Sequence, residues 1–151
     1  MHLSLPAFEY KVKKQEKGLY IYDIIRKKYV LLTPEEWVRQ HFIHYLIHYK
    51  NYAPALVAIE REIDVYGLKK RFDIVCYDRK GKPYLIVECK AASVPLSQQV
   101  FDQVFGYNLT LAARYVVVQM VGCIYAVIRT RNEFFVFWKI FPILSKSLAG
   151  N

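Results

Sequence analysis

The sequence predicts a mixed α/β fold, in which a β-sheet carries helices on its faces. Three observations lead to this prediction: a strong helix start at Thr33, a β-hairpin over 71–90, and a second helical segment over 95–113 that more strands follow. Strands and helices that alternate along a chain indicate a sheet covered by helices. The 151 residues, 54% of them hydrophobic, suffice for a single domain over 1–151 with a buried core.

The N-terminal third predicts short strands followed by a long helix. Residues 8–12 indicate an early strand, and 19–25 and 29–32 indicate two more around the polar turn at 26–28. The helix is expected over 33–49, before the polar stretch Lys-Asn-Tyr-Ala-Pro.

Three residues mark the start of this helix. Thr33 fits the N-cap, Pro34 the first helical position and Glu36 the capping-box position. One apolar stripe contains residues 38, 42, 45, 46 and 49, and a neighbouring stripe contains Glu36, Gln40, Ile43 and Ile47.

His41, His44 and His48 fall on one side of the same helix, at a spacing that could suit a transition metal. No cysteine or carboxylate joins them at a ligand spacing, so we expect an exposed His/Tyr face instead.

The remaining elements build the sheet. Residues 57–66 alternate apolar with charged side chains, as in a half-exposed strand. After the hairpin and the second helix, the apolar run 115–121 is typical of a strand covered on both faces. Two further strands are expected over 123–129 and 134–140.

The hairpin places two acids together. Its predicted strands, 72–77 and 84–89, flank a polar turn that contains Gly81. If the turn is centred on the Lys80–Gly81 bond, Asp73 lies directly opposite Glu88, and like charges about 5 Å apart repel. Lys90 shares the face of Glu88, because side chains alternate along a strand.

Two carboxylates and a lysine form a ligand set for a divalent cation. Mg²⁺ needs few protein carboxylates, since water and phosphate oxygens complete its shell. Such an ion can activate water for phosphodiester hydrolysis, and a lysine beside it can stabilise developing charge. Taken alone the pattern is weak, because exposed strands often carry paired Glu and Lys. Glu62 and Asp64 also alternate on a strand, but no lysine accompanies them as Lys90 accompanies Glu88.

The net charge of +9, from 22 Lys and Arg against 13 Asp and Glu, favours a polyanionic partner such as nucleic acid. Charge that serves only to keep the protein in solution is the alternative. The basic residues cluster at 11–17, 26–28, 69–71, 79–82 and 129–131.

No apolar run is long enough to cross a membrane, and the N-terminus lacks the order of a signal peptide. Cys76, Cys89 and Cys123 are odd in number and form no CxxC pair, which indicates reduced, buried thiols. We therefore expect a cytoplasmic protein without membrane contact.

Four segments in succession resemble one known family: TPEEWVRQ on the first helix, RFDIV, LIVECK, and Gln103-Val-Phe-Gly-Tyr107. They are similar to the nuclease domain of type I restriction endonuclease R subunits, in the PD-(D/E)xK superfamily and its branch with a trailing Gln-x-x-x-Tyr motif. The resemblance covers about 30–130, taken as the core, and implies a restriction-endonuclease-like mixed sheet flanked by helices.

The resemblance also implies roles for individual residues. Asp73 and Glu88 would hold Mg²⁺, for which Mn²⁺ could substitute, and Lys90 would be the catalytic lysine. Glu36 would be the acidic residue of the first helix near the metal, although capping already explains it. Near the site and the substrate backbone would lie Gln103 and Tyr107, with the basic residues Lys69, Lys70 and Arg71.

The expected function is thus a Mg²⁺-dependent DNA endonuclease. The phosphate-binding loop of NTP-driven motors is absent from the 151 residues, so we expect a nuclease that stands alone or works with a separately encoded translocase or specificity subunit. A non-catalytic module that binds nucleic acid or a partner is the alternative, and RNA or branched DNA is a third substrate class. The oligomeric state does not follow from the sequence.

Overall fold

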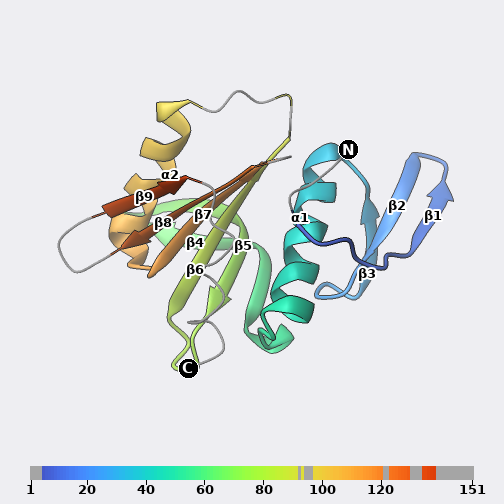
Figure 1. The fold of residues 1–151 in the computed structure, drawn as a ribbon, viewed down its shortest axis with the longest axis horizontal. Coiled ribbons are helices and arrows are strands. Elements are labelled where there is room, and N and C mark those ends of the chain that lie inside the picture. The colour runs from blue at the N-terminus through green and yellow to red at the C-terminus, as the bar shows by residue number, and fades with distance from the viewer. Residues whose placement is uncertain (1–4, 92, 94–96, 121–122, 130–133, 139–151) are drawn as a thin grey trace.

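The computed structural model describes residues 5–91, 93, 97–120, 123–129 and 134–138, and confirms the mixed α/β fold. A six-stranded sheet has the order β4-β5-β6-β7-β8-β9, and a second sheet has the order β1-β2-β3. Figure 1 shows α1 between the two sheets and α2 on the far side of the large one. The large sheet consists of β4 (Val57–Val65), β5 (Leu68–Tyr77), β6 (Pro83–Lys90), β7 (Tyr115–Met120), β8 (Cys123–Arg129) and β9 (Phe134–Trp138).

The pair β6 and β7 is parallel, while the other neighbours in the large sheet are antiparallel. A parallel pair needs a crossover connection, and α2 (Gln98–Leu111) supplies it. The helix expected over 95–113 is confirmed within these bounds, and residues 95 and 96 lie outside the described part. The helix ends at Leu111 with Ala112 in the left-handed conformation, and the Asn108 side-chain amide exchanges two hydrogen bonds with the backbone of Ala113, at 2.9 and 3.0 Å.

The helix α1 (Pro34–His44) starts as predicted. The Thr33 hydroxyl accepts a 3.0 Å hydrogen bond from the backbone N–H of Glu36. The helix continues directly as a π-helical turn, Tyr45–Tyr49. After a short non-helical segment, a 3₁₀ turn, Pro54–Leu56, leads into β4. The expected end at residue 49 is therefore confirmed, although the last turn is wider than an α-helix.

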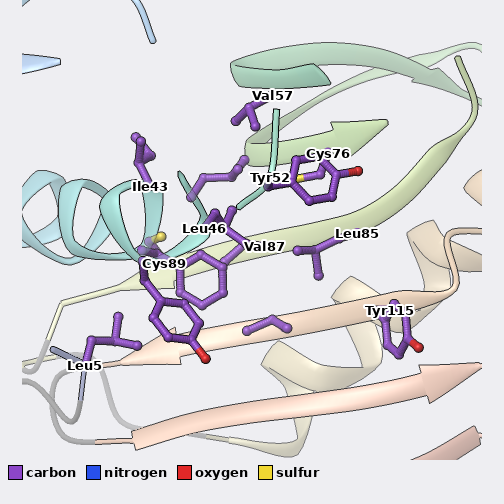
Figure 2. Packing of buried hydrophobic residues seen from close by; sticks show 14 of the residues in the cluster. Leu5, Ile43, Leu46, Tyr52, Val57, Cys76, Leu85, Val87, Cys89 and Tyr115 are labelled. Atoms are coloured by element: carbon purple, nitrogen blue, oxygen red, sulfur yellow. The ribbon is translucent and has the colours of Figure 1, made fainter. Parts of the chain in front are cut away.

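Alternate residues of β6 pack into two cores. Leu85, Val87 and Cys89 face α1, and Figure 2 shows them with Ile43 and Leu46 of the helical segment. Ile86 faces the other way, into a cluster that Tyr107 of α2 covers. The strand β6 is thus buried on both faces, and its position is set by both helices. Cys76 and Cys89 are free, buried thiols, as expected; the side chain of Cys123 lies outside the described part.

The small sheet consists of β1 (Val12–Gln15), β2 (Gly18–Asp23) and β3 (Lys28–Leu31). The strand expected at 8–12 is wrong, since β1 begins only at Val12. The Phe8 ring instead packs on α1, with its centroid 4.2 Å from that of His44 and 4.5 Å from that of His41. Aromatic contact with the helix, rather than strand pairing, explains the apolar alternation before Val12.

The expected exposed His/Tyr face is also wrong for two of its histidines. His41 and His44 are buried, while His48 is exposed. Burial, together with the neighbouring histidine, lowers the pKa of His41 to about 4 and that of His44 to about 4. Both rings are therefore neutral at pH 7 and act as part of the apolar contact with Phe8. No described helix is long and apolar enough to span a membrane.

The two histidines make stability dependent on pH. Their pKa values are lower in the folded than in the unfolded chain, so the unfolded chain binds more protons, and the free energy of unfolding decreases as the pH is lowered. Between pH 7 and pH 5 each should cost about 2 kcal/mol of the free energy of unfolding. We expect His41→Phe to reduce this slope in urea unfolding, because it removes one of the two buried rings. Equal slopes in the wild type and His41→Phe would contradict the burial of a neutral ring.

Candidate active site

The site forms where β5 and β6 separate. Their pairing runs from Cys76↔Leu85 to Ile74↔Val87, in the register expected for the hairpin. Beyond that pair β5 continues along β4, while β6 continues along β7. Asp73 and Glu88 are the next residues on the two strands, so both carboxylates lie at the fork between them.

Asp73 closes the fork with its side chain. Its Oδ2 accepts a 2.7 Å hydrogen bond from the backbone N–H of Cys89 on β6. Its Oδ1 accepts a 2.6 Å hydrogen bond from Nη2 of Arg39 on α1. The carboxylate therefore joins three elements, and 14% of its side chain remains exposed.

Glu88 and Lys90 form an ion pair on the same side of β6, with 2.8 Å between Oε1 and Nζ. Burial and then the charge of Asp73 raise the pKa of Glu88, although Lys90 lowers it. Burial alone would lower the pKa of Lys90, but the hydrogen bond and charge of Glu88 raise it. Burial is the largest cause of this shift, and the nearby Asp73 carboxylate adds to it.

The two acids of the first helix have different surroundings. Glu36 is buried, and its carboxylate accepts hydrogen bonds from Arg26, Arg39 and Gln40. Glu35 is half-exposed and lies within electrostatic reach of Glu88 and Lys90, raising the pKa of both. Glu35, which the sequence reasoning passed over, is therefore the acid that faces the fork. The helical stripe that Glu36 shares with Gln40 and Ile43 was the available signal that Glu36 points into the protein.

Two arginines that the sequence reasoning did not single out hold the surrounding acids. Arg26 binds Asp23, Glu36 and Glu60 at 2.6, 2.5 and 2.9 Å. Arg39 binds Glu35, Glu36 and Asp73. The charge of Asp73 and that of Glu36 raise the pKa of Arg39 despite its burial, so it stays charged. Two cations thus face five carboxylates, which leaves the network negative in a protein of net charge +9.

Glu60 stands next to Asp73 on the neighbouring strand, between the pairs Ile59↔Ile74 and Arg61↔Phe72. Its backbone has φ = +51°, in the left-handed region that non-glycine residues seldom adopt. Such backbone strain is often found at functional sites, where the surroundings enforce it.

A cavity of about 160 Å³ opens beside Glu88, on the α2 side of the sheet. It brings together Gln103 and Tyr107 of α2 with Lys70 and Arg71 of β5. The amide nitrogen of Gln103 donates a 3.1 Å hydrogen bond to the Tyr107 hydroxyl, and hydrogen bonds from Lys70 and Gln103 lower the pKa of Tyr107. The cavity therefore offers two cations and several hydrogen-bond donors close to the fork.

Lys69 does not line this cavity. It lies directly opposite Asp64, and Arg71 lies opposite Glu62. Opposite charges that face each other across strands stabilise an antiparallel pair. Glu62 and Asp64 therefore face basic residues of β5 across the strand pair.

The carboxylates at the fork suit a hard divalent cation that takes most of its ligands from water and substrate. Within the described part of the chain, no three His, Cys, Asp or Glu side chains are arranged to hold one metal. Asp73 and Glu88 keep acceptor capacity, since each carboxylate oxygen has two lone pairs. Mg²⁺ accepts one or two carboxylates with water and phosphate oxygens. The residues thus fit Mg²⁺ or Mn²⁺ held by two carboxylates, but not a cage of protein ligands.

Comparisons with known proteins place the chain in a family. Residues 34–142 match the family model described as "Type I restriction enzyme R protein N terminus (HSDR_N)". None of the curated proteins compared with the chain matches it. Among solved structures, the chain is similar to a fragment described as that of an HsdR subunit of a type I restriction enzyme from Vibrio vulnificus YJ016. The identity is 22% and the TM-score 0.36, over 56% of this chain and 16% of that chain, so this likeness places no site residue.

Arg39 should be essential to folding. Arg39→Met removes the charge but keeps most of the side-chain bulk, and leaves buried carboxylates uncompensated. We expect a loss of about 3–5 kcal/mol in the free energy of unfolding, measured in urea. Arg61→Met, at an exposed position of β4, should change it by less than about 0.5 kcal/mol. Equal effects of the two substitutions would contradict a structural role for the network.

Glu88→Gln, in contrast to Arg39→Met, should not destabilise the metal-free protein. It removes a charge that Asp73 and Glu35 repel, so the metal-free melting temperature should stay equal or rise, while the gain in melting temperature on adding Mg²⁺ is lost. Glu62→Gln, on the exposed face of β4, should keep that gain. A clearly lower metal-free melting temperature for Glu88→Gln would show instead that Glu88 is a structural partner of Lys90.

Proposed function

The chain belongs to the family of type I restriction enzyme R protein N termini, and from this membership we propose that it is a metal-dependent endodeoxyribonuclease domain of the PD-(D/E)xK type. The observation that carries the proposal is the convergence of Asp73, Glu88 and Lys90 at the fork, beside a basic cavity. Neither the family nor the fold alone would assign a reaction.

Asp73 and Glu88 would hold Mg²⁺, or Mn²⁺, which when bound supplies an activated water and charge stabilisation. Arg39 and the Cys89 backbone N–H fix the Asp73 carboxylate in place. Lys90, held by Glu88, directs its ammonium to the same side of β6, where it can stabilise charge that develops on a phosphate.

The cavity would hold the DNA backbone next to the scissile bond. Lys70 and Arg71 offer positive charge, while the amide of Gln103 and the hydroxyl of Tyr107 can donate to phosphate oxygens. These contacts read no base edge, so the domain would have little sequence preference of its own. Translocation and site recognition would come from other parts of the enzyme or from separate subunits. The free thiols Cys76 and Cys89 agree with a cytoplasmic location.

A second candidate is a non-catalytic binding module on the same fold. The hydrogen bond from Arg39 to Asp73 favours it, because that contact satisfies part of the carboxylate without a metal. An affinity for DNA that changes neither on adding metal nor in Lys90→Ala would support this candidate.

Cleavage of supercoiled plasmid DNA tests the proposal. We expect nicking with Mg²⁺ or Mn²⁺, none with EDTA, and a rate lower by about 100-fold or more in Asp73→Ala, Glu88→Ala or Lys90→Ala. Glu9→Ala, at an exposed position, should nick at the wild-type rate, as a control for the loss of an acid. Single-stranded RNA and branched DNA, tested alongside, define the substrate class. Full activity in Asp73→Ala or Glu88→Ala would overturn the assignment.

A further inference from the structure

The small sheet carries an aromatic and basic surface that the proposed cutting site does not use. We propose that its outer face, formed by Lys13, Tyr20, Tyr22 and Tyr29, binds single-stranded nucleic acid by base stacking and backbone attraction. This goes beyond the proposed function, since it needs neither the metal nor the fork.

The pairing register separates the two faces of this sheet. Ile21 lies opposite Val12 and Val30, and both Ile21 and Asp23 are fully buried on the side toward α1, where Asp23 accepts a 2.8 Å hydrogen bond from Gln40. Because side chains alternate along a strand, the residues between them point away from α1. The outer face therefore contains Tyr20, Tyr22 and Tyr29, together with Lys13 and Leu31.

Among the residues that the structure describes, side chains of the outer face contact one another. The centroids of the Tyr22 and Tyr29 rings are 5.3 Å apart, with 65° between the ring planes. The Lys13 ammonium lies 4.1 Å from the centre of the Tyr29 ring. Tyr20 lies directly between Lys13 and Leu31, and 43% of Leu31 is exposed. Three half-buried tyrosines with a lysine among them thus form a continuous, accessible surface.

The charge around this surface is mostly positive. Asp23 is neutralised by Arg26, which leaves exposed Glu9 and Glu16 as the acids of the segment 9–31. The exposed lysines of the same segment are Lys11, Lys13, Lys14, Lys17, Lys27 and Lys28. This excess of positive charge suits a polyanion and repels a second copy of the same face.

A single strand fits these features better than a duplex does. Unpaired bases expose their flat faces, which stack on aromatic side chains, while lysines around the rings attract the phosphates. A duplex keeps its bases stacked inside and would contact only the lysines. The tyrosines and the lysines together therefore favour a strand with unpaired bases.

Fluorescence anisotropy in EDTA tests this with a labelled oligothymidylate of about 15 nucleotides. We expect Tyr22→Leu/Tyr29→Leu, which keeps apolar bulk but removes both rings, to weaken binding about ten-fold or more. Tyr22→Phe/Tyr29→Phe keeps the rings and should bind as the wild type does. Tyr66→Leu, at a tyrosine that is 81% exposed in the turn between β4 and β5, is the matched control and should not change binding. The far-ultraviolet circular dichroism of each variant shows whether it is folded.

The contribution of the lysines is tested by measuring how the affinity for the oligonucleotide depends on salt concentration. Lys11→Gln/Lys13→Gln should reduce the slope of log affinity against log salt by about 1, and Lys80→Gln/Lys82→Gln, in the exposed turn between β5 and β6, should not. The affinity for an oligouridylate of the same length shows whether the surface prefers DNA or RNA. A preference for either one is consistent with base stacking and attraction of the backbone.

Three results would overturn the proposal: unchanged binding in folded Tyr22→Leu/Tyr29→Leu, equal affinity for a duplex of the same length, or displacement of the strand by polyglutamate at equal charge concentration. The last would identify an acidic protein as the partner. Because binding is measured without metal, its failure leaves the nuclease proposal standing, and the absence of cleavage leaves this proposal standing.

Discussion

The structure depends on a buried network of ions in which Arg39 joins α1 to the large sheet. Its guanidinium binds acids of its own helix and Asp73 of β5. Arg26, in the turn between β2 and β3, binds Glu36 of the same helix and Glu60 of β4. Buried charges are costly to remove from water unless they are paired with good geometry. The small sheet, α1 and the large sheet are therefore held together by charge as well as by apolar packing. The candidate site lies at the edge of this ion-pair network.

Local signals predicted most of the fold. Thr33 and Pro34 specify a helix start through backbone geometry alone, and the register of the hairpin follows from its polar turn. The strand expected at 8–12 failed because alternating apolar residues are compatible with either strand pairing or contact with a helix. The Phe8 ring packs on His44 of α1, and neither partner is visible in a local pattern. Burial of His41 and His44 was missed for the same reason.

The candidate site was predicted in part. The pairing register brings Asp73 and Glu88 to neighbouring positions, and their spacing along the chain carries that information. Arg26, Arg39 and Glu60 could not be predicted, because ion pairs between distant segments leave no periodicity in a sequence. Glu35 and Glu36 are both acids of the first helical turn, and only the packing of α1 shows which one points to the fork.

The separation of β5 from β6 has a consequence for the order of folding. Asp73 and Glu88 belong to a hairpin that closes locally, and on its own this hairpin carries mutual repulsion at its open end. The cation that relieves it, Arg39, comes from 34 residues earlier in the chain. Contacts between distant segments form at a greater cost in chain entropy than local ones. We therefore expect the open end of the hairpin to become ordered together with the docking of α1, so that the arrangement of side chains at the fork is assembled only in the complete fold.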